Sequence, residues 1–169
     1  MSKEDAEMAD ARQLKKAQEV YQTLCDALEA RQWSYDKDTE NPEKLYVRFT
    51  VNGEDIPMRL TLFVDANREL VRLMSFMPFN IPEDKREILA IATCEANYKM
   101  ADGGFDMDLD DGAILFRMNA SYRSSLVSES MMQYMISCTC STVDRYNDLF
   151  LMLGKGAITL SQFMQTIGA

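Results

Sequence analysis

The stretch from Lys44 to Met77 most constrains how this chain folds, because it reads as three strands joined by two tight turns. Its first turn falls at Asn52-Gly53, a dipeptide typical of two-residue hairpin turns, since both positions tolerate positive φ. Alternation on either side of that turn places a continuous row of apolar residues on one face. The residues predicted to be buried on this face are Leu45, Val47, Phe49, Ile56, Met58, Leu60, Leu62 and Leu73.

The position of the Asn52-Gly53 turn also predicts which residues pair across the strands. Val51 is expected opposite Glu54, followed by Phe49 with Ile56, Val47 with Met58, and Leu45 with Leu60. A second turn at Ala66-Asn67 sets Leu62 opposite Val71 and Leu60 opposite Leu73. The alternative for this second turn is a left-handed Asn67 with a bulge.

A second hairpin is predicted between Gly104 and Met118, around a turn at Asp111-Gly112. The expected pairs are Leu109 with Ile114, Met107 with Phe116, Phe105 with Met118 and, on the other face, Asp106 with Arg117. The alternating acids also resemble the start of a calcium-binding EF-hand loop. Counted from Asp106, however, the sixth position is Asp111 rather than glycine, and the twelfth is Arg117 rather than glutamate. The pattern therefore favours a hairpin over a calcium site.

Segments with apolar residues three and four positions apart predict the helices. Helices are expected from about residue 8 to Arg31, from Pro82 to Tyr98, from Ser128 to Leu153, and from Thr159 to Ile167. The first carries an apolar stripe of Leu14, Ala17, Tyr21, Leu24 and Leu28. Residues 1–8 are expected to be frayed, residues 36–43 to form a surface loop, and residues 154–169 to form a C-terminal helical extension.

Together these elements predict an α+β fold, in which an antiparallel five-stranded sheet, made of a three-strand meander plus a hairpin, is packed with helices. The element order is α-β-β-β-α-β-β-α-α. We expect a single domain over residues 1–169, because a chain of 169 residues that is 47% hydrophobic can bury a core without a disulfide or a metal.

The composition argues against several classes of function. The chain has no histidine, which removes Ser-His-Asp and Cys-His catalytic groups and most zinc sites. Its net charge of −9 argues against nucleic acid as a partner. Gly154-Lys155-Gly156 lacks the spacing of a phosphate-binding loop. We therefore predict no catalytic residue, no cofactor and no metal site.

Cysteine usage and hydropathy predict the compartment. The four cysteines, Cys25, Cys94, Cys138 and Cys140, are scattered over helical segments, which suits reduced thiols better than a disulfide framework. No apolar run approaches the roughly 20 residues of a membrane-spanning helix, and the first residues lack the apolar core of a signal peptide. We expect a cytoplasmic protein that does not enter a membrane.

The second face of the predicted sheet mixes arginines with aromatic residues. The candidate partner-binding residues on it are Tyr46, Arg48, Arg59, Phe63, Arg72, Phe76 and Arg117. Arginine and aromatic residues dominate binding hot spots, so this face suits an acidic or extended peptide. The alternative is a half-exposed face on which arginine stems lie over apolar neighbours, while Asp106 and Asp108 balance the charge. The methionines after Ser128 leave a similar choice between a binding groove and core packing.

Several segments resemble the YbjN family of bacterial proteins. They are WSYDKD from Trp33, VRFTVNGEDIPMRLTLFVD from Val47, LVRLMSFMPFNIPEDKREILAIATCEANYKM from Leu70, GGFDMDLDDGAILFRMN from Gly103 and TVDRYNDLF from Thr142. The resemblance runs from about residue 17 to residue 153 and implies a sensory-transduction-regulator domain with a type III secretion chaperone-like fold. It implies no catalytic residue, because the family has no catalytic motif to transfer. Chaperones of that fold bind proteins, often as dimers.

Two functions from different classes fit these observations. The first is a non-catalytic protein-protein interaction module, a chaperone-like or regulatory adaptor of the bacterial cytoplasm. It is expected to be a homodimer that binds an acidic or extended segment of a protein partner. The alternative is a small-molecule-binding or carboxylate-based enzymatic protein that uses the sheet face. The missing histidine, the absent phosphate loops and the dispersed acids favour the first.

Overall fold

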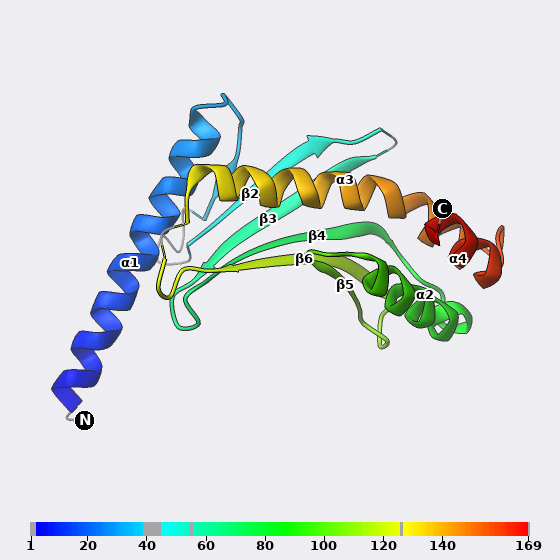
Figure 1. Cartoon of the computed structure of the whole chain (residues 1–169), viewed down its shortest axis with the longest axis horizontal. Helices are drawn as coiled ribbons and strands as arrows, with labels where there is room; N and C mark the ends of the chain where they lie inside the picture. Colours follow the sequence, from blue (N-terminus) through cyan, green and yellow to red (C-terminus); the bar gives the residue numbers. More distant parts are fainter. Residues whose placement is uncertain (1–2, 39–44, 55, 126, 169) are drawn as a thin grey trace.

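The computed structural model describes residues 3–38, 45–54, 56–125 and 127–168, and Figure 1 shows helices packed on a twisted sheet. The sheet is antiparallel, and within these residues it has six strands in the order β1-β2-β3-β4-β6-β5. The strands are β1 (Asp36–Lys37), β2 (Tyr46–Asn52), β3 (Pro57–Asp65), β4 (Leu70–Asn80), β5 (Gly104–Met107) and β6 (Ala113–Ser121). The helices are α1 (Lys3–Glu29), the 3₁₀ turn η1 (Glu83–Lys85), α2 (Arg86–Lys99), α3 (Glu129–Gly154) and α4 (Leu160–Gly168). The predicted α+β class is confirmed.

The predicted number of five strands is wrong, because the sheet also contains the short strand β1. In β1, Asp36 pairs with Arg48 and Lys37 pairs with Val47. Both β1 residues are polar and exposed, so this strand has none of the apolar alternation that identifies the other strands. Residues 39–43 of the loop predicted at 36–43 lie outside the described residues.

The first hairpin is confirmed, but its predicted register is wrong. The observed pairs are Val51 with Met58, Phe49 with Leu60 and Val47 with Leu62. The turn lies two residues further along the chain than predicted, because Asn52 pairs with Pro57 and the N–H of Gly53 donates to the carbonyl of Ile56 at 3.0 Å. Its tip is held by α3, where both carboxylate oxygens of Asp144 accept from the N–H of Glu54 at 3.2 Å. A tertiary contact therefore accompanies a turn that local sequence does not predict.

The other two hairpins also form with a shifted register. The observed pairs are Leu62 with Leu73 and Leu60 with Ser75 between β3 and β4, and Phe105 with Phe116 and Met107 with Ile114 between β5 and β6. The left-handed residue of the β3–β4 turn is Glu69, with φ of 52°, rather than Asn67. In the β5–β6 turn, Gly112 has φ of 79°. All three registers differ from prediction by an even number of residues, so every side chain keeps its predicted face.

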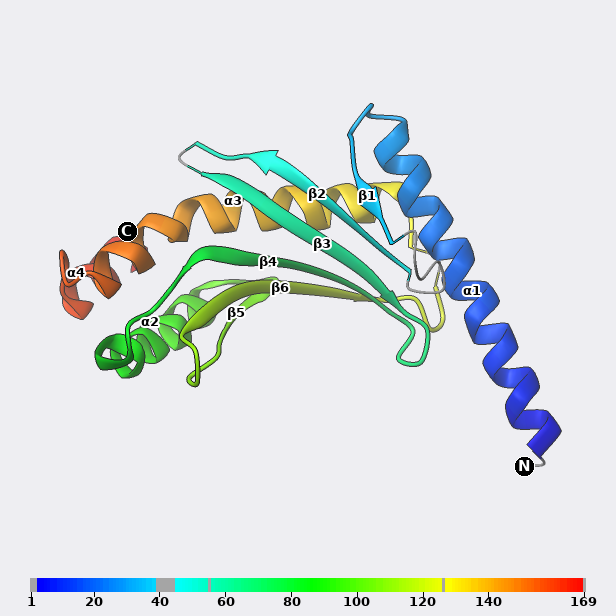
Figure 2. The same cartoon turned by 180° about the vertical axis from the view of Figure 1, so that it is seen from behind.

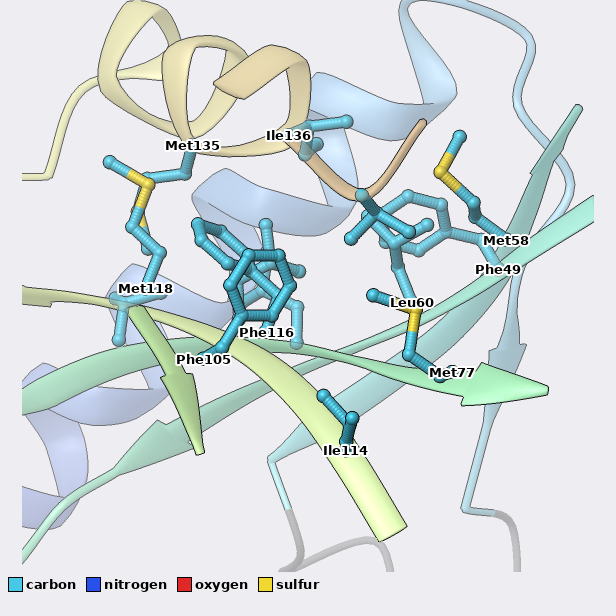
Figure 3. Close-up of a cluster of buried hydrophobic side chains, with 14 of the residues drawn as sticks. Phe49, Met58, Leu60, Met77, Phe105, Ile114, Phe116, Met118, Met135 and Ile136 are labelled. Atoms are coloured by element: carbon cyan, nitrogen blue, oxygen red, sulfur yellow. The ribbon is translucent and has the colours of Figure 1, made fainter. Parts of the chain in front are cut away.

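The inner face of the sheet packs against α1 and α3. The residues predicted to be buried there are buried, with the exception of Ile56, which is half-buried because it lies in the β2–β3 turn. The largest aromatic cluster on this face surrounds Phe105, whose ring centroid lies 5.2 Å from that of Phe116, 5.3 Å from Tyr146 and 5.0 Å from Phe150. Figure 3 shows Phe105 and Phe116 together below Met135 of α3.

Five methionines fill the core. The buried ones are Met58, Met77, Met118, Met132 and Met135. Unbranched thioether side chains fit the irregular space between a helix and a twisted sheet. On α3, Met132 and Met135 are buried, whereas Met131 and Met152 are 43% and 36% exposed. The structure therefore favours core packing over a methionine-lined groove on this helix.

Helix α1 begins at Lys3, inside the segment for which we expected fraying. Ala17, Leu24 and Leu28 of its predicted apolar stripe are buried and Tyr21 is half-buried, whereas Leu14 is 43% exposed. Figures 1 and 2 show the N-terminal half of α1 extending past the edge of the sheet. The stripe is therefore buried only where the helix lies over the sheet.

The C-terminal extension contributes to the core. Its helix, α4, lies against α2. The ring of Phe163 stacks on that of Phe150 from α3, with centroids 5.5 Å apart, and Ile167 is also buried. The helix expected from Thr159 is thus present, and its Phe163 packs against the aromatic cluster around Phe105 through Phe150.

Candidate functional site

The candidate site is the sheet face turned away from α1 and α3, which we call the open face (Figures 1 and 2). Its residues alternate along each strand with the buried ones, and no residue among them is fully buried. The open face consists of Tyr46, Arg48, Thr50, Arg59, Thr61, Phe63, Arg72, Met74, Phe76, Asp106, Leu115, Arg117 and Asn119. The seven predicted partner-binding residues all lie on it.

The four arginines of the open face do not form one stripe. Arg48 and Arg117 lie in the same row across the sheet, but Thr61 and Met74 stand between them. Because each strand adds about 4.8 Å, residues three strands apart do not interact directly. The structure therefore separates the arginines that the sequence suggests as one set.

Two arginines come close together near the β1 edge. Arg59 lies directly across from Thr50, and Arg48 is the next residue of β2 on the same face. Diagonal neighbours of this kind lie roughly 7–8 Å apart, within reach of long side chains. Both arginines, with Ser34, Asp36 and Thr50, line a hollow of about 510 Å³. This is the most strongly basic part of the open face.

Arg48 and Arg117 have partners of their own. The guanidinium of Arg48 lies 4.9 Å from the ring centroid of Tyr46, and Asp36 lies directly across from it in β1. Arg117 forms an ion pair with Asp106, with 2.9 Å between Nη2 and Oδ2. The predicted pairing of Asp106 with Arg117 therefore exists as a diagonal contact, since the directly opposed residue is Gly104.

Arg72 is half-buried and lies directly across from Phe63. Its positive charge lowers the pKa of the Asp65 carboxyl. Burial alone raises the pKa of Asp65. Hydrogen bonds at 3.0 Å from the N–H and the guanidinium of Arg68, together with the charges of Arg68 and Arg72, nevertheless hold this pKa below its usual value. Part of the Arg72 charge is thus compensated within the protein.

Arg59 is the uncompensated cation of the set. It is exposed, and it makes no ion pair or hydrogen bond within the described part of the chain. A guanidinium presents a planar fork of donors that matches a carboxylate. Arg59 is therefore the side chain of the open face best placed to bind an acidic group from outside.

The aromatic residues of the open face form two groups. Tyr46 and Phe63 lie directly across from one another and are half-buried, with the hydroxyl of Tyr46 donating to the carboxylate of Asp38 at 3.2 Å. Phe76 is 54% exposed and lies across from Leu115. The open face therefore offers apolar contact area as well as charge.

Two apolar members of the open face, Met74 and Leu115, are missing from the sequence-based set. Met74 lies between Arg72 and Phe76 along β4, and strand alternation alone places it on the same face. The same rule places Leu115 beside Arg117. Strand alternation is therefore the sequence signal that identifies Met74 and Leu115. They are absent from the predicted set because that set contains only arginine and aromatic residues.

The far end of the open face is acidic. The β5–β6 turn and its flanking strands form a shallow hollow of about 650 Å³ beside Phe76 and Leu115. Its acidic residues are Asp106, Asp108, Asp110 and Asp111. The open face is thus basic toward β1 and acidic toward β5, with apolar residues between the two ends.

Other features bear on alternative chemistries. Within the described residues, no three or more Cys, Asp or Glu side chains lie close enough together to hold a metal ion. In the same part of the chain, no helix is long and apolar enough to cross a membrane. The four cysteines are free, with Cys25 buried, Cys94 exposed and the other two half-buried.

Thiol labelling should distinguish these cysteines. With iodoacetamide at pH 8, Cys94 should react first, because it is the exposed thiol. Cys140 should react slowly, because burial, helped by the nearby Asp144 charge, raises its pKa to about 11 and the thiolate is the reactive form. Mass spectrometry of peptides after timed quenching measures both rates. Faster labelling of Cys140 than of Cys94, or a bridge between Cys138 and Cys140, would contradict the structure.

The comparisons with known proteins agree with this fold. The sequence profile of the YbjN family, described as "Putative bacterial sensory transduction regulator", matches residues 21–152. A crystal structure of YbjN from E. coli, described as "a putative transcription regulator", superposes with a TM-score of 0.52 at 9% identity. That superposition covers 80% of this chain and 90% of the E. coli chain, and at such low identity it shows the fold alone. No curated protein matches the sequence. Because the family profile matches most of the chain, the chain belongs to the YbjN family.

Proposed function

We propose that this chain is a non-catalytic regulatory module of the bacterial cytoplasm that binds a protein partner through its open face. The observation that carries this proposal is the composition of a sheet face that α1 and α3 leave uncovered: arginine, aromatic and aliphatic side chains lie next to one another and are partly exposed. A sheet face in water is normally polar, whereas arginine and aromatic residues are enriched at protein interfaces.

Charge favours an acidic partner segment at the β1 end. The chain carries a net charge of −9, yet Arg48 and Arg59 lie together there, and Arg59 makes no ion pair within the described residues. A local basic patch attracts acidic groups and repels basic ones, which speeds encounter and selects the partner. The open face is broad rather than enclosed, which suits a polypeptide segment better than a small molecule.

The family supports a regulatory role, since it is described as a sensory transduction regulator. The type III secretion chaperone-like fold implied by the resemblance is used by proteins that bind other proteins as dimers, so the proposal includes a homodimer. The alternative, a small-molecule or enzymatic site on the same face, needs an enclosed pocket with several titratable groups.

Replacing Arg59 and Arg72 together by serine tests the proposal. Capture of partners from a native bacterial lysate should fall about tenfold or more, because an interface arginine at a hot spot contributes about 2 kcal/mol or more. The free energy of unfolding should change by no more than about 1 kcal/mol, because these arginines do not fill the core. Quantitative mass spectrometry of captured proteins and thermal unfolding give the two readouts, and analytical ultracentrifugation at low and physiological salt gives the oligomeric state.

The matched control is Arg12→Ser with Lys15→Ser, which removes the same charge from exposed positions on α1. This control should capture the same partners as the wild type. Equal capture by all three proteins, with the same oligomer, would mean that the arginines are merely solvated. Unfolding of the Arg59 and Arg72 variant at a much lower temperature would assign these residues a structural role and remove the main support for the proposal.

A further inference from the structure

The two edges of the sheet differ in how their outward-facing backbone groups are hydrogen-bonded. At the β5 edge, the side chain of Asn97 from α2 donates to the carbonyl of Phe105 at 2.9 Å and accepts from its N–H at 2.7 Å. This contact occupies backbone groups that would otherwise be free to pair with another strand. At the opposite edge, β1 pairs only with Arg48 and Val47, although β2 continues to Asn52.

The continuation of β2 beyond β1 presents backbone groups outward. The bonds from the N–H of Gly53 to the carbonyl of Ile56, and from the N–H of Val64 to the carbonyl of Leu45, show that the odd-numbered residues of β2 bond to β3. In an antiparallel ladder, the alternate residues direct their N–H and C=O to the other side. Thr50 and Asn52 therefore point theirs at the outer edge, where no described strand pairs with them.

A hollow lies on each side of this edge. The hollow on the open face, of about 510 Å³, contains Arg48 and Arg59. The hollow on the helix side, of about 350 Å³, contains Trp33 and Val51. Ser34, Phe49 and Thr50 line both, so the two hollows meet along the edge of β2.

The two hollows differ in chemistry. On the helix side, Trp33 is 37% exposed and its ring centroid lies 5.8 Å from that of Phe49, so it forms an apolar wall. On the open face, the guanidinium of Arg59 has no ion pair or hydrogen bond within the described part of the chain, and Arg59 of β3 lies directly across from Thr50 of β2. An extended peptide alternates its side chains between the two faces of a sheet. A strand added here therefore sends one side chain to Trp33 and the next to the arginines.

Strand β1 already provides one acidic residue next to an arginine of the open face. In β1, the acidic residue Asp36 lies directly across from Arg48 on the open face. Resting on the proposed protein-binding function, we infer that β2 accepts an extended partner segment as an additional strand alongside Thr50 to Asn52. Its acidic side chains meet Arg59 and Arg48, and the apolar ones between them meet Trp33. Main-chain pairing provides affinity, and the alternation of charge and apolarity provides specificity.

Fluorescence provides a direct test, because Trp33 is the only tryptophan in the chain. The probe is a synthetic peptide, acetyl-Ser-Glu-Val-Glu-Val-Glu-Ser-amide, titrated into the full chain at low and physiological salt. Saturable change in Trp33 emission is expected, with weaker binding at physiological salt. The same peptide with lysine in place of glutamate should produce no saturable change.

Backbone methylation distinguishes strand addition from side-chain docking. The peptide residue directly across from Thr50 is a glutamate, because it lies on the open face, and it exchanges both main-chain hydrogen bonds with Thr50. The glutamate N–H groups therefore point toward β2, and the valine N–H groups point away from it. N-methylation of the glutamates should therefore abolish binding. N-methylation of the valines, the matched control, should leave the affinity within about threefold.

A protein variant provides the complementary test. Arg59→Ser should weaken binding of the unmethylated peptide at least tenfold, whereas Arg12→Ser, an exposed arginine on α1, should not. Equal binding of the two methylated peptides, with loss in Arg59→Ser, would overturn strand addition while leaving a partner-binding open face in place. If Arg59→Ser binds the peptide as tightly as the wild type, and if lysate capture by the Arg59 and Arg72 variant is also unchanged, both proposals are wrong. The other possible occupant of this edge is a second copy of the chain, and analytical ultracentrifugation tests for it. If the peptide converts a dimer to monomers, the edge is a dimer interface and the inference of a partner strand is wrong.

Discussion

Gly112→Ala should lower the free energy of unfolding by about 3 kcal/mol. Gly112 has φ of 79°, a left-handed conformation that costs an alanine about 1–2 kcal/mol. A Cβ at this position would also lie 2.9 Å from the backbone nitrogen of Ile81 and closer still to its carbonyl oxygen. Backbone atoms move less easily than side chains, so overpacking adds about 1–3 kcal/mol. Urea unfolding followed by circular dichroism measures the loss.

The reason for this sensitivity is a contact between two parts of the fold. The N–H of Ile81 donates to the carbonyl of Gly112 at 2.9 Å, which ties the end of β4 to the β5–β6 turn. Gly156→Ala is the matched control, because Gly156 has φ of 69° and no neighbouring atom within 4 Å of the added Cβ. It should cost only about 1–2 kcal/mol. Equal losses for the two variants would show that Ile81 does not press on the hairpin turn.

Phe105→Ala should be the most destabilising of the side-chain truncations on the inner face, at about 4–5 kcal/mol. Phe105 is 2% exposed, and its ring makes edge contacts with Phe116, Tyr146 and Phe150. Truncation leaves a cavity between the sheet and α3 and removes aromatic pairs that contribute about 0.5–1.5 kcal/mol beyond area burial. Chemical denaturation at two protein concentrations separates this effect from any change in self-association.

Phe76→Ala is the control for Phe105→Ala. The two residues have the same side chain, but Phe76 lies on the open face and is 54% exposed. Its truncation should cost less than about 1 kcal/mol, because little apolar area leaves the core. A loss at Phe76 as large as that at Phe105 would mean that something covers the open face, or that the faces of the sheet are reversed.

The sequence by itself determines which side chains face the core. Alternation along a strand has a period of two, so Leu60 and Leu62 share a face whatever residue stands opposite them. The predicted register of every hairpin is wrong, yet each error is an even number of residues and leaves the faces unchanged. For the same reason, all the candidate binding residues lie on the open face.

The tertiary structure decides the registers, because the turns are held by distant groups. Asp144 of α3 binds the N–H of Glu54 at the tip of the first hairpin, and a Cβ on Gly53 would meet that carboxylate. Ile81 similarly abuts Gly112 in the second. A local preference for the predicted turn position is worth too little to outweigh such contacts and the packing of the strands beneath them.

The arrangement of the candidate site depends on the same registers. Sequence alone identifies Arg59 and Arg72 as members of one face, but only the pairing of β2, β3 and β4 shows that they stand apart, with Arg59 near Arg48 and the sheet edge. The strand β1 carries no apolar pattern, because its two residues are held by main-chain pairing and not by burial. Side-chain periodicity determines the faces, while strand pairing, which is set by contacts far apart in the chain, determines the neighbours and the open edge.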